Sequence, residues 1–163
     1  MLNDAFLCLL ATLDFPDKYW ALCDRFPLVP GSSFAASKKE ILAAFEAAGA
    51  SIRYDSRDRS FEIESEKIGA IEWKALLVKQ RGGLEFMISG LGPEGYIGSN
   101  FAVLAYEGKR KEDPGFVRSP FSGPPPYPRP SASNPVQLAA LVQEFVGLVR
   151  EIKAALRKCA EAV

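Results

Sequence analysis

The apolar residues near the end of the chain recur at alternating three- and four-residue steps, and this run constrains the fold more than any other feature. Such spacing places them on one face of a helix. Asn134 can cap that helix, Pro135 suits its first position, and Gln137 completes a weak capping box. We expect the helix to bury its stripe against a sheet of the same chain, with a coiled-coil partner as the alternative. The stripe comprises Leu138, Leu141, Phe145, Leu148, Ile152, Ala155 and Cys159.

Shorter helices are expected in the first part of the chain. Asn3 can cap the first one, and a second can follow Pro16. Ser37 and Glu40 form a capping-box pattern for a third helix over residues 38–48.

After residue 49 the apolar spacing changes from helical to alternating, which predicts strands. The turns between them are polar or rich in glycine. The predicted strands are residues 52–54, 61–65, 71–80, 84–89 and 100–107.

The middle strands carry apolar side chains on both faces. Leu76 and Val78 alternate with Trp73 and Leu77, and Met87 lies between two apolar neighbours. Strands of this kind are typical of sheets that are covered on both sides. We therefore expect helices to sandwich at least part of the sheet.

Together these patterns predict an α+β fold: an antiparallel meander of about five strands, with N-terminal helices and a long C-terminal helix packed on it. The 163 residues, 48% of them hydrophobic and 25% charged, suit a single globular domain over residues 1–163. Prolines crowd residues 108–133. Consecutive prolines favour a stiff path, so we expect a long, ordered loop pinned across the surface.

Charge and composition restrict the partners and the compartment. Lysine plus arginine equals aspartate plus glutamate, at 20 each, which argues against nucleic-acid binding. No apolar run approaches the ~18–20 residues of a membrane span, so no membrane partner is expected. The three cysteines form no close pair. They suggest reduced, partly buried thiols in a cytoplasmic protein.

The residues that would support an enzyme are missing from the sequence. The chain has no histidine, which removes the commonest general base and zinc ligand. The string Gly90-Leu-Gly-Pro-Glu-Gly95 matches a dinucleotide pattern, but a predicted strand follows it, so we interpret it as a connection between strands. We expect no catalysis, no metal and no cofactor.

Two surface features could bind a protein. Glu62, Glu64 and Glu66 alternate with other residues, which predicts three carboxylates on one face of a strand. They either protect a sheet edge or dock a basic partner. The string Pro124-Pro-Pro-Tyr127 is either a rigid connector or a ligand of a modular domain.

Several short strings in the second half of the chain are similar to those of a known family. They are Gly98-Ser-Asn-Phe101, Tyr127-Pro-Arg-Pro130, Ser133-Asn-Pro and the closing helix with Glu151-Ile-Lys153. The chain thus resembles the immunity proteins that accompany polymorphic and contact-dependent toxins. The resemblance implies a cytoplasmic, non-catalytic inhibitor that binds one cognate protein toxin. Our own hypothesis for the contacts is Arg57, Arg59, Glu62, Glu64, Glu66, Tyr127 and Arg129.

Two other functions remain open. A secretion-effector chaperone has a similar size and would form a homodimer, although such chaperones are acidic and this chain is neutral. The third possibility is a small-molecule-binding α+β domain, or an enzyme without histidine that uses carboxylates and Tyr106 or Tyr127.

Overall fold

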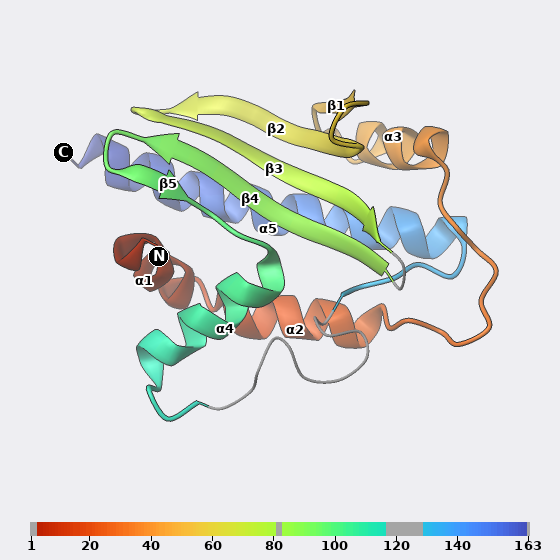
Figure 1. Ribbon diagram of the computed structural model, residues 1–163, viewed down its shortest axis with the longest axis horizontal. Coiled ribbons are helices and arrows are strands. Elements are labelled where there is room, and N and C mark those ends of the chain that lie inside the picture. Colours follow the sequence, from red (N-terminus) through yellow and green to blue (C-terminus); the bar gives the residue numbers. More distant parts are fainter. Residues whose placement is uncertain (1–2, 81–82, 117–128, 163) are drawn as a thin grey trace.

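The computed structural model describes residues 3–80, 83–116 and 129–162. Its helices and strands form an α+β fold, as predicted (Figure 1). In chain order the elements are α1 (Asp4–Thr12), α2 (Phe15–Arg25), α3 (Lys38–Ala47), β1 (Ile52–Asp55), β2 (Ser60–Ile68), β3 (Ile71–Gln80), β4 (Gly83–Gly92), β5 (Gly95–Ile97), α4 (Phe101–Glu112) and α5 (Pro135–Glu161).

The predicted helix caps are confirmed. Asn3 accepts a hydrogen bond from a backbone amide in the first turn of α1. Ser37 and Glu40 exchange the two hydrogen bonds of a capping box at 3.1 and 2.8 Å. Asn134 caps α5 by accepting from the Gln137 amide at 2.9 Å. Each cap satisfies amides that have no partner inside the helix.

The sheet is an antiparallel meander with the strand order β1-β2-β3-β4-β5. The turn after β1 connects neighbouring antiparallel strands, as expected. The string Gly90–Gly95 also joins two antiparallel strands, but its glycines belong to the ends of β4 and β5, with Pro93 and Glu94 between them. The fifth strand is Gly95–Ile97, however, and the prediction of a strand over residues 100–107 was wrong.

Residues 101–112 form helix α4 because local capping and packing favour a helix. The Asn100 side chain accepts from the Val103 amide at 2.9 Å. Phe101, Leu104 and Ala105 are buried at helical spacing. A short apolar run fits either a strand or a buried helix by periodicity alone, and the asparagine cap distinguishes the two here.

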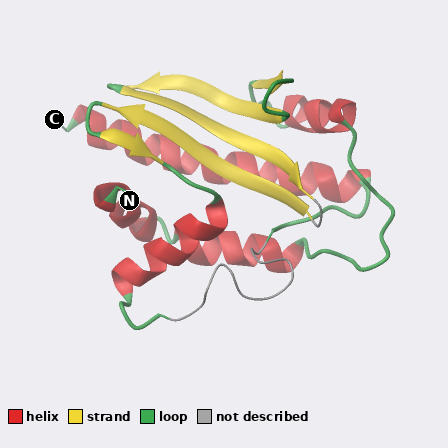
Figure 2. Ribbon diagram, viewed as in Figure 1, coloured by secondary structure: helices red, strands yellow, loops and turns green. Residues whose placement is uncertain are grey.

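The described helices pack on one face of the sheet (Figures 1 and 2), and α5 runs along that face. Phe86 of β4 stacks on Phe145 of α5 with ring centroids 3.9 Å apart. Trp73 of β3 meets Phe6 of α1 edge to face at 6.5 Å. Along β3 and β4, buried residues alternate with half-buried ones. For the described residues, the expectation of helices on both faces was wrong, because an antiparallel sheet can leave one face open.

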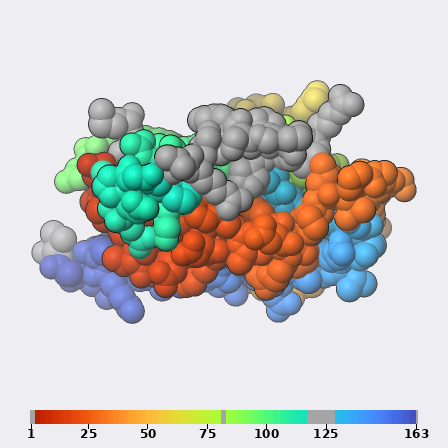
Figure 3. Space-filling view, turned by 90° about the horizontal axis from the view of Figure 1, so that it is seen from below, coloured from red at the N-terminus to blue at the C-terminus, as the bar shows by residue number. Residues whose placement is uncertain are grey.

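Helix α4 lies against α1 and α2, as Figure 3 shows from below. Phe101 contributes to the contact with α2, with its ring 5.0 Å from that of Phe15 and 5.6 Å from that of Tyr19. Aromatic pairs at these separations are favourable beyond the area that they bury. The three helices and the sheet therefore share one core.

Helix α5 packs on the sheet of its own chain, as predicted. It buries Leu138, Leu141, Phe145 and Ile152 from the predicted stripe. Leu148 and Ala155 are half-buried and Cys159 is exposed. The helix also buries five residues outside the predicted stripe: Val142, Val146, Val149, Lys153 and Leu156.

The segment that leads into α5 is pinned at two points. The Leu84 amide of β4 donates to the Pro130 carbonyl at 2.9 Å, and the Ser131 amide donates to the Phe26 carbonyl at 2.7 Å. A Cβ at Gly83 would lie 2.8 Å from the Pro130 oxygen, so this close approach requires glycine. The predicted loop over residues 108–133 begins too early, because α4 extends to residue 112. Residues 117–128 lie outside the described residues.

None of the three cysteines, all of them described, forms a disulfide bond. Cys23 is half-buried, as expected, whereas Cys8 and Cys159 are exposed. Both exposed cysteines lie on outward faces of helices that bury other residues.

Candidate protein-binding surface

The face of the sheet opposite α5 carries a row of half-buried apolar residues. Strand register places Leu76 directly between Glu62 and Met87. Val78 lies two residues further along β3, on the same face. Leu76, Val78 and Met87 are each half-buried, and we call them the apolar stripe. No helix among the described residues covers the stripe.

A group of charges borders the apolar stripe. Glu62 accepts hydrogen bonds from Arg53 at 2.5 Å and from Lys74 at 2.7 Å. The bond from Lys74, followed by that from Arg53, holds the pKa of Glu62 below its ordinary value. Glu62 is therefore a fixed carboxylate, with only 10% of its side chain exposed.

Glu64 and Glu66 do not share a face with Glu62, so the prediction of three carboxylates in one strip was wrong. The register of β2 shifts between Ile63 and Glu66. In this bulge Glu64 adopts φ 53°. One extra residue reverses the alternation, and Glu66 therefore pairs with Trp73 on the face that the helices cover.

The two displaced glutamates bind cations of α5. Lys153 lies 3.0 Å from Glu64 and 3.2 Å from Glu66, and its side chain is only 4% exposed. Arg150 binds Glu64 at 3.0 Å, and Arg157 binds Glu66. Burial alone would raise the pKa of Glu64, but the hydrogen bonds from Lys153 and Arg150 outweigh it and lower that pKa. These glutamates fasten α5 to β2.

Arg57 and Arg59 lie in the turn between β1 and β2. The Arg57 side chain is 88% exposed and approaches Asp55 at 3.7 Å. The Arg57 amide also donates to Asp55, and this bond is the main reason that the pKa of Asp55 falls despite some desolvation. Arg59 is exposed and has φ 52°. The turn adjoins Ser60, which lies opposite Val78, so both arginines are near one end of the apolar stripe.

Arg129 is largely enclosed. Its side chain is 12% exposed, and its guanidinium lies 3.9 Å from Glu85. Glu85 also accepts a hydrogen bond from Gln80 at 2.8 Å. Tyr127 lies outside the described residues. The structure thus groups Arg57, Arg59 and Glu62 around the stripe and separates them from Glu64 and Glu66.

The apolar stripe was not among the predicted contacts, although the sequence pattern that marks it was present. Apolar residues on both faces of β3 and β4 were assigned to burial under helices. An antiparallel meander with helices at its two ends can equally leave one such face uncovered. Half-buried apolar residues on that face are therefore candidates for contact with a partner.

Searches of family models, curated proteins and solved structures returned no match to this chain. In the described ranges, no three side chains of His, Cys, Asp or Glu gather in a way that could hold a metal ion. None of the helices described for this chain has the length and apolar character needed to cross a membrane.

Proposed function

We propose that this protein is a non-catalytic immunity protein that binds and neutralises a cognate bacterial toxin through the open face of its sheet. The observation that carries the proposal is the apolar stripe, which lies on a sheet face free of helices among the described residues. Protein interfaces commonly combine an apolar centre with a polar rim. Leu76, Val78 and Met87 would form the centre, and the neighbouring charges the rim.

The rigidity of this face favours binding. The stripe lies on β3 and β4, which pair with each other over nearly their whole lengths. Arg53 and Lys74 hold Glu62 in place before any partner arrives. A surface that is already ordered loses less conformational entropy on association.

The positions of the predicted contact residues in the structure rank them as candidates for binding a toxin. Arg57 and Arg59 border the apolar stripe with exposed side chains and remain our first choices. Glu62 also borders the stripe, but its side chain is only 10% exposed and already pairs with Arg53 and Lys74. Glu64 and Glu66 could meet a toxin only by giving up ion pairs with α5. Arg129 is mostly buried, and Tyr127 remains a contact proposed from the sequence alone.

A growth assay tests the proposal. The full chain is expressed in a bacterium together with the protein encoded by the neighbouring reading frame. We expect the neighbour alone to arrest growth and this chain to restore it. The double variant Leu76→Thr/Met87→Thr keeps residues that suit strands but removes the apolar centre, and it should fail to restore growth.

The control is Val136→Asp, which changes a residue that is 80% exposed and lies at the start of α5 rather than on the sheet. It should restore growth as the wild type does. Circular dichroism checks that both variants are folded. A neighbour without toxicity, or equal rescue by the double variant, would contradict the proposal. A stable homodimer in native mass spectrometry would favour the chaperone instead.

A further inference from the structure

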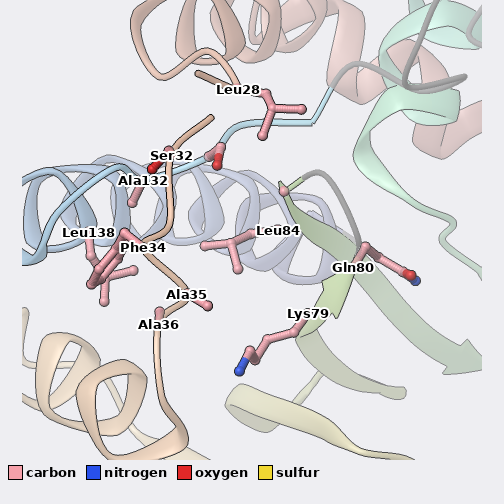
Figure 4. A pocket seen from close by; sticks show the side chains of 12 residues that line it. Leu28, Ser32, Phe34, Ala35, Ala36, Lys79, Gln80, Leu84, Ala132 and Leu138 are labelled. Atoms are coloured by element: carbon pink, nitrogen blue, oxygen red, sulfur yellow. The ribbon is translucent and has the colours of Figure 1, made fainter. Parts of the chain in front are cut away.

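A second surface lies at the end of the core, and none of the residues of the apolar stripe lines it. A pocket of about 300 Å³ opens where the tips of β3 and β4 meet the loop after α2 and the segment before α5 (Figure 4). Its apolar lining includes Leu28, Phe34, Leu84 and Leu138. Leu84 is 7% exposed and Leu28 is 46% exposed, so the lining extends from the core to the surface.

Lys79 supplies a charge at this pocket. It is opposite Leu84 in the sheet register and therefore belongs to the face that the helices cover. It is exposed there, because it lies near the end of β3. Among the lining residues that the structure describes, Lys79 is the only charged one, and no described carboxylate pairs with it. In Figure 4 its side chain extends toward the segment with Ala35 and Ala36.

The third feature is the backbone of residues 33–36. These residues belong to neither a helix nor a strand. No backbone hydrogen bond joins them to another segment in the described part of the chain. Phe34, Ala35 and Ala36 also line the pocket, so free main-chain donors and acceptors lie beside its apolar wall. An extended peptide can pair with such a backbone while its side chains fill the pocket.

We infer that this pocket binds an extended segment of a partner protein that carries a large apolar side chain next to an aspartate or glutamate. The apolar side chain packs against Leu84 and Leu138, and the carboxylate meets Lys79. The segment's main chain pairs with residues 33–36. The inference rests on the proposed function, since the partner would be the toxin. None of the three stripe residues lines the pocket, so the two surfaces can be tested separately.

The test uses the full chain and arrays of immobilised octapeptides. One array carries Leu or Phe followed by Asp or Glu in a background of Gly, Ser and Thr. A matched array replaces each acid by its amide, and a third replaces the apolar residue by Ser. We expect binding to the first array to exceed binding to the amide array by about threefold to fivefold, as for one exposed ion pair. The third array should bind least.

Two variants connect the binding to the pocket. Lys79→Gln should remove the preference for acid over amide. Ala35→Phe should fill the mouth of the pocket and reduce binding to every array. Its matched control is Ala154→Phe, at an exposed position on α5 outside the lining, and it should bind as the wild type does.

Equal binding to all three arrays, or binding unchanged by Ala35→Phe, would overturn the inference. Octanoate serves as a further probe, because it has the same chemistry without a main chain. If octanoate binds to the chain but none of the array peptides does, the pocket is a small-molecule site and the inference fails. If the growth assay succeeds but no peptide binds, the inference alone fails and the proposed function stands.

Discussion

Lys153 donates from the buried face of α5 to Glu64 of β2 at 3.0 Å, although the two residues are 89 positions apart. The same amine lies 3.2 Å from Glu66. Arg150 adds a bond to Glu64 and another to the Gly49 carbonyl at 2.8 Å. The bulge of β2 and the middle of α5 are therefore joined by a network of charges rather than by apolar contacts alone.

Lys153→Met should destabilise the fold by about 3 kcal/mol. The substitution preserves an unbranched side chain of similar length but leaves Glu64 with one fewer cation in a largely buried site. We place the cost at the low end for a broken buried pair because Arg150 and Arg157 still bind the two glutamates. Urea unfolding followed by circular dichroism measures the change.

The double variant Lys153→Met/Glu64→Gln provides the control for this prediction. Removing both charges should recover part of the stability that the single variant loses, since residue 64 then carries no charge that has lost a partner and Glu66 keeps its ion pair with Arg157. Additive losses would show that the two residues are not coupled and would contradict the role that we assign to the network.

Acid should weaken the fold through Glu62 and Glu64. Hydrogen bonds lower the pKa of Glu62, and they outweigh burial to lower that of Glu64. The folded state therefore binds protons less readily than the unfolded chain, whose glutamates titrate near a pKa of about 4.3. The stabilisation is complete above that pH and is lost as the pH falls through the lower, folded values.

The variant Glu62→Gln isolates one of these carboxylates. It should be less stable than the wild type at pH 7, and the difference should shrink as the pH is lowered from about 5 to about 3. Urea midpoints measured across this range follow the change. A difference that stays constant with pH would rule out the contribution of Glu62.

Local signals in the sequence were sufficient to predict most of the fold. The caps at Ser37 and Asn134 and the alternating strands each depend on residues close together in the chain. The bulge at Glu64 could not be predicted in this way. It is an extra residue relative to β3, and its side chain finds its partner only when α5 packs. The assignment of three glutamates to one face failed for this reason.

The candidate surface was only partly predictable. Leu76 and Met87 were visible as apolar residues on a second sheet face, but their exposure depends on where the helices pack. That arrangement is tertiary, as is the change of residues 101–112 from a predicted strand to α4. Sequence periodicity indicates which residues of a strand lie on the same face of the sheet, whereas tertiary packing decides what covers that face.

Asn100→Ala tests the helix that the sequence analysis missed. The side chain of Asn100 caps α4, and its loss should cost about 1 kcal/mol. Asn100→Ser should retain most of the stability, because serine also caps helices well. Thermal or urea unfolding distinguishes the two variants. Equal stability of both would mean that the cap contributes nothing to α4.

Two glycines should respond to alanine in opposite directions. Gly98 has φ +130°, and a Cβ there would clash with the Ile88 carbonyl oxygen. Gly147 lies in the interior of α5, and a Cβ there meets nothing within 4 Å. Gly98→Ala must therefore shift the backbone of β4 and destabilise the fold. Gly147→Ala should stabilise it by about 0.5–1 kcal/mol, since glycine is the poorer helix former.

Urea unfolding of the two glycine variants beside the wild type measures both signs in one experiment. Each substitution adds the same methyl group. The difference between the two changes in stability therefore reports the backbone conformation at each position and the space around it. We expect the unfolding midpoint of Gly98→Ala below that of the wild type and the midpoint of Gly147→Ala above it. A stabilising Gly98→Ala would mean that there is room for a Cβ between residue 98 and the Ile88 carbonyl of β4. A destabilising Gly147→Ala would mean that another surface packs against this position of α5.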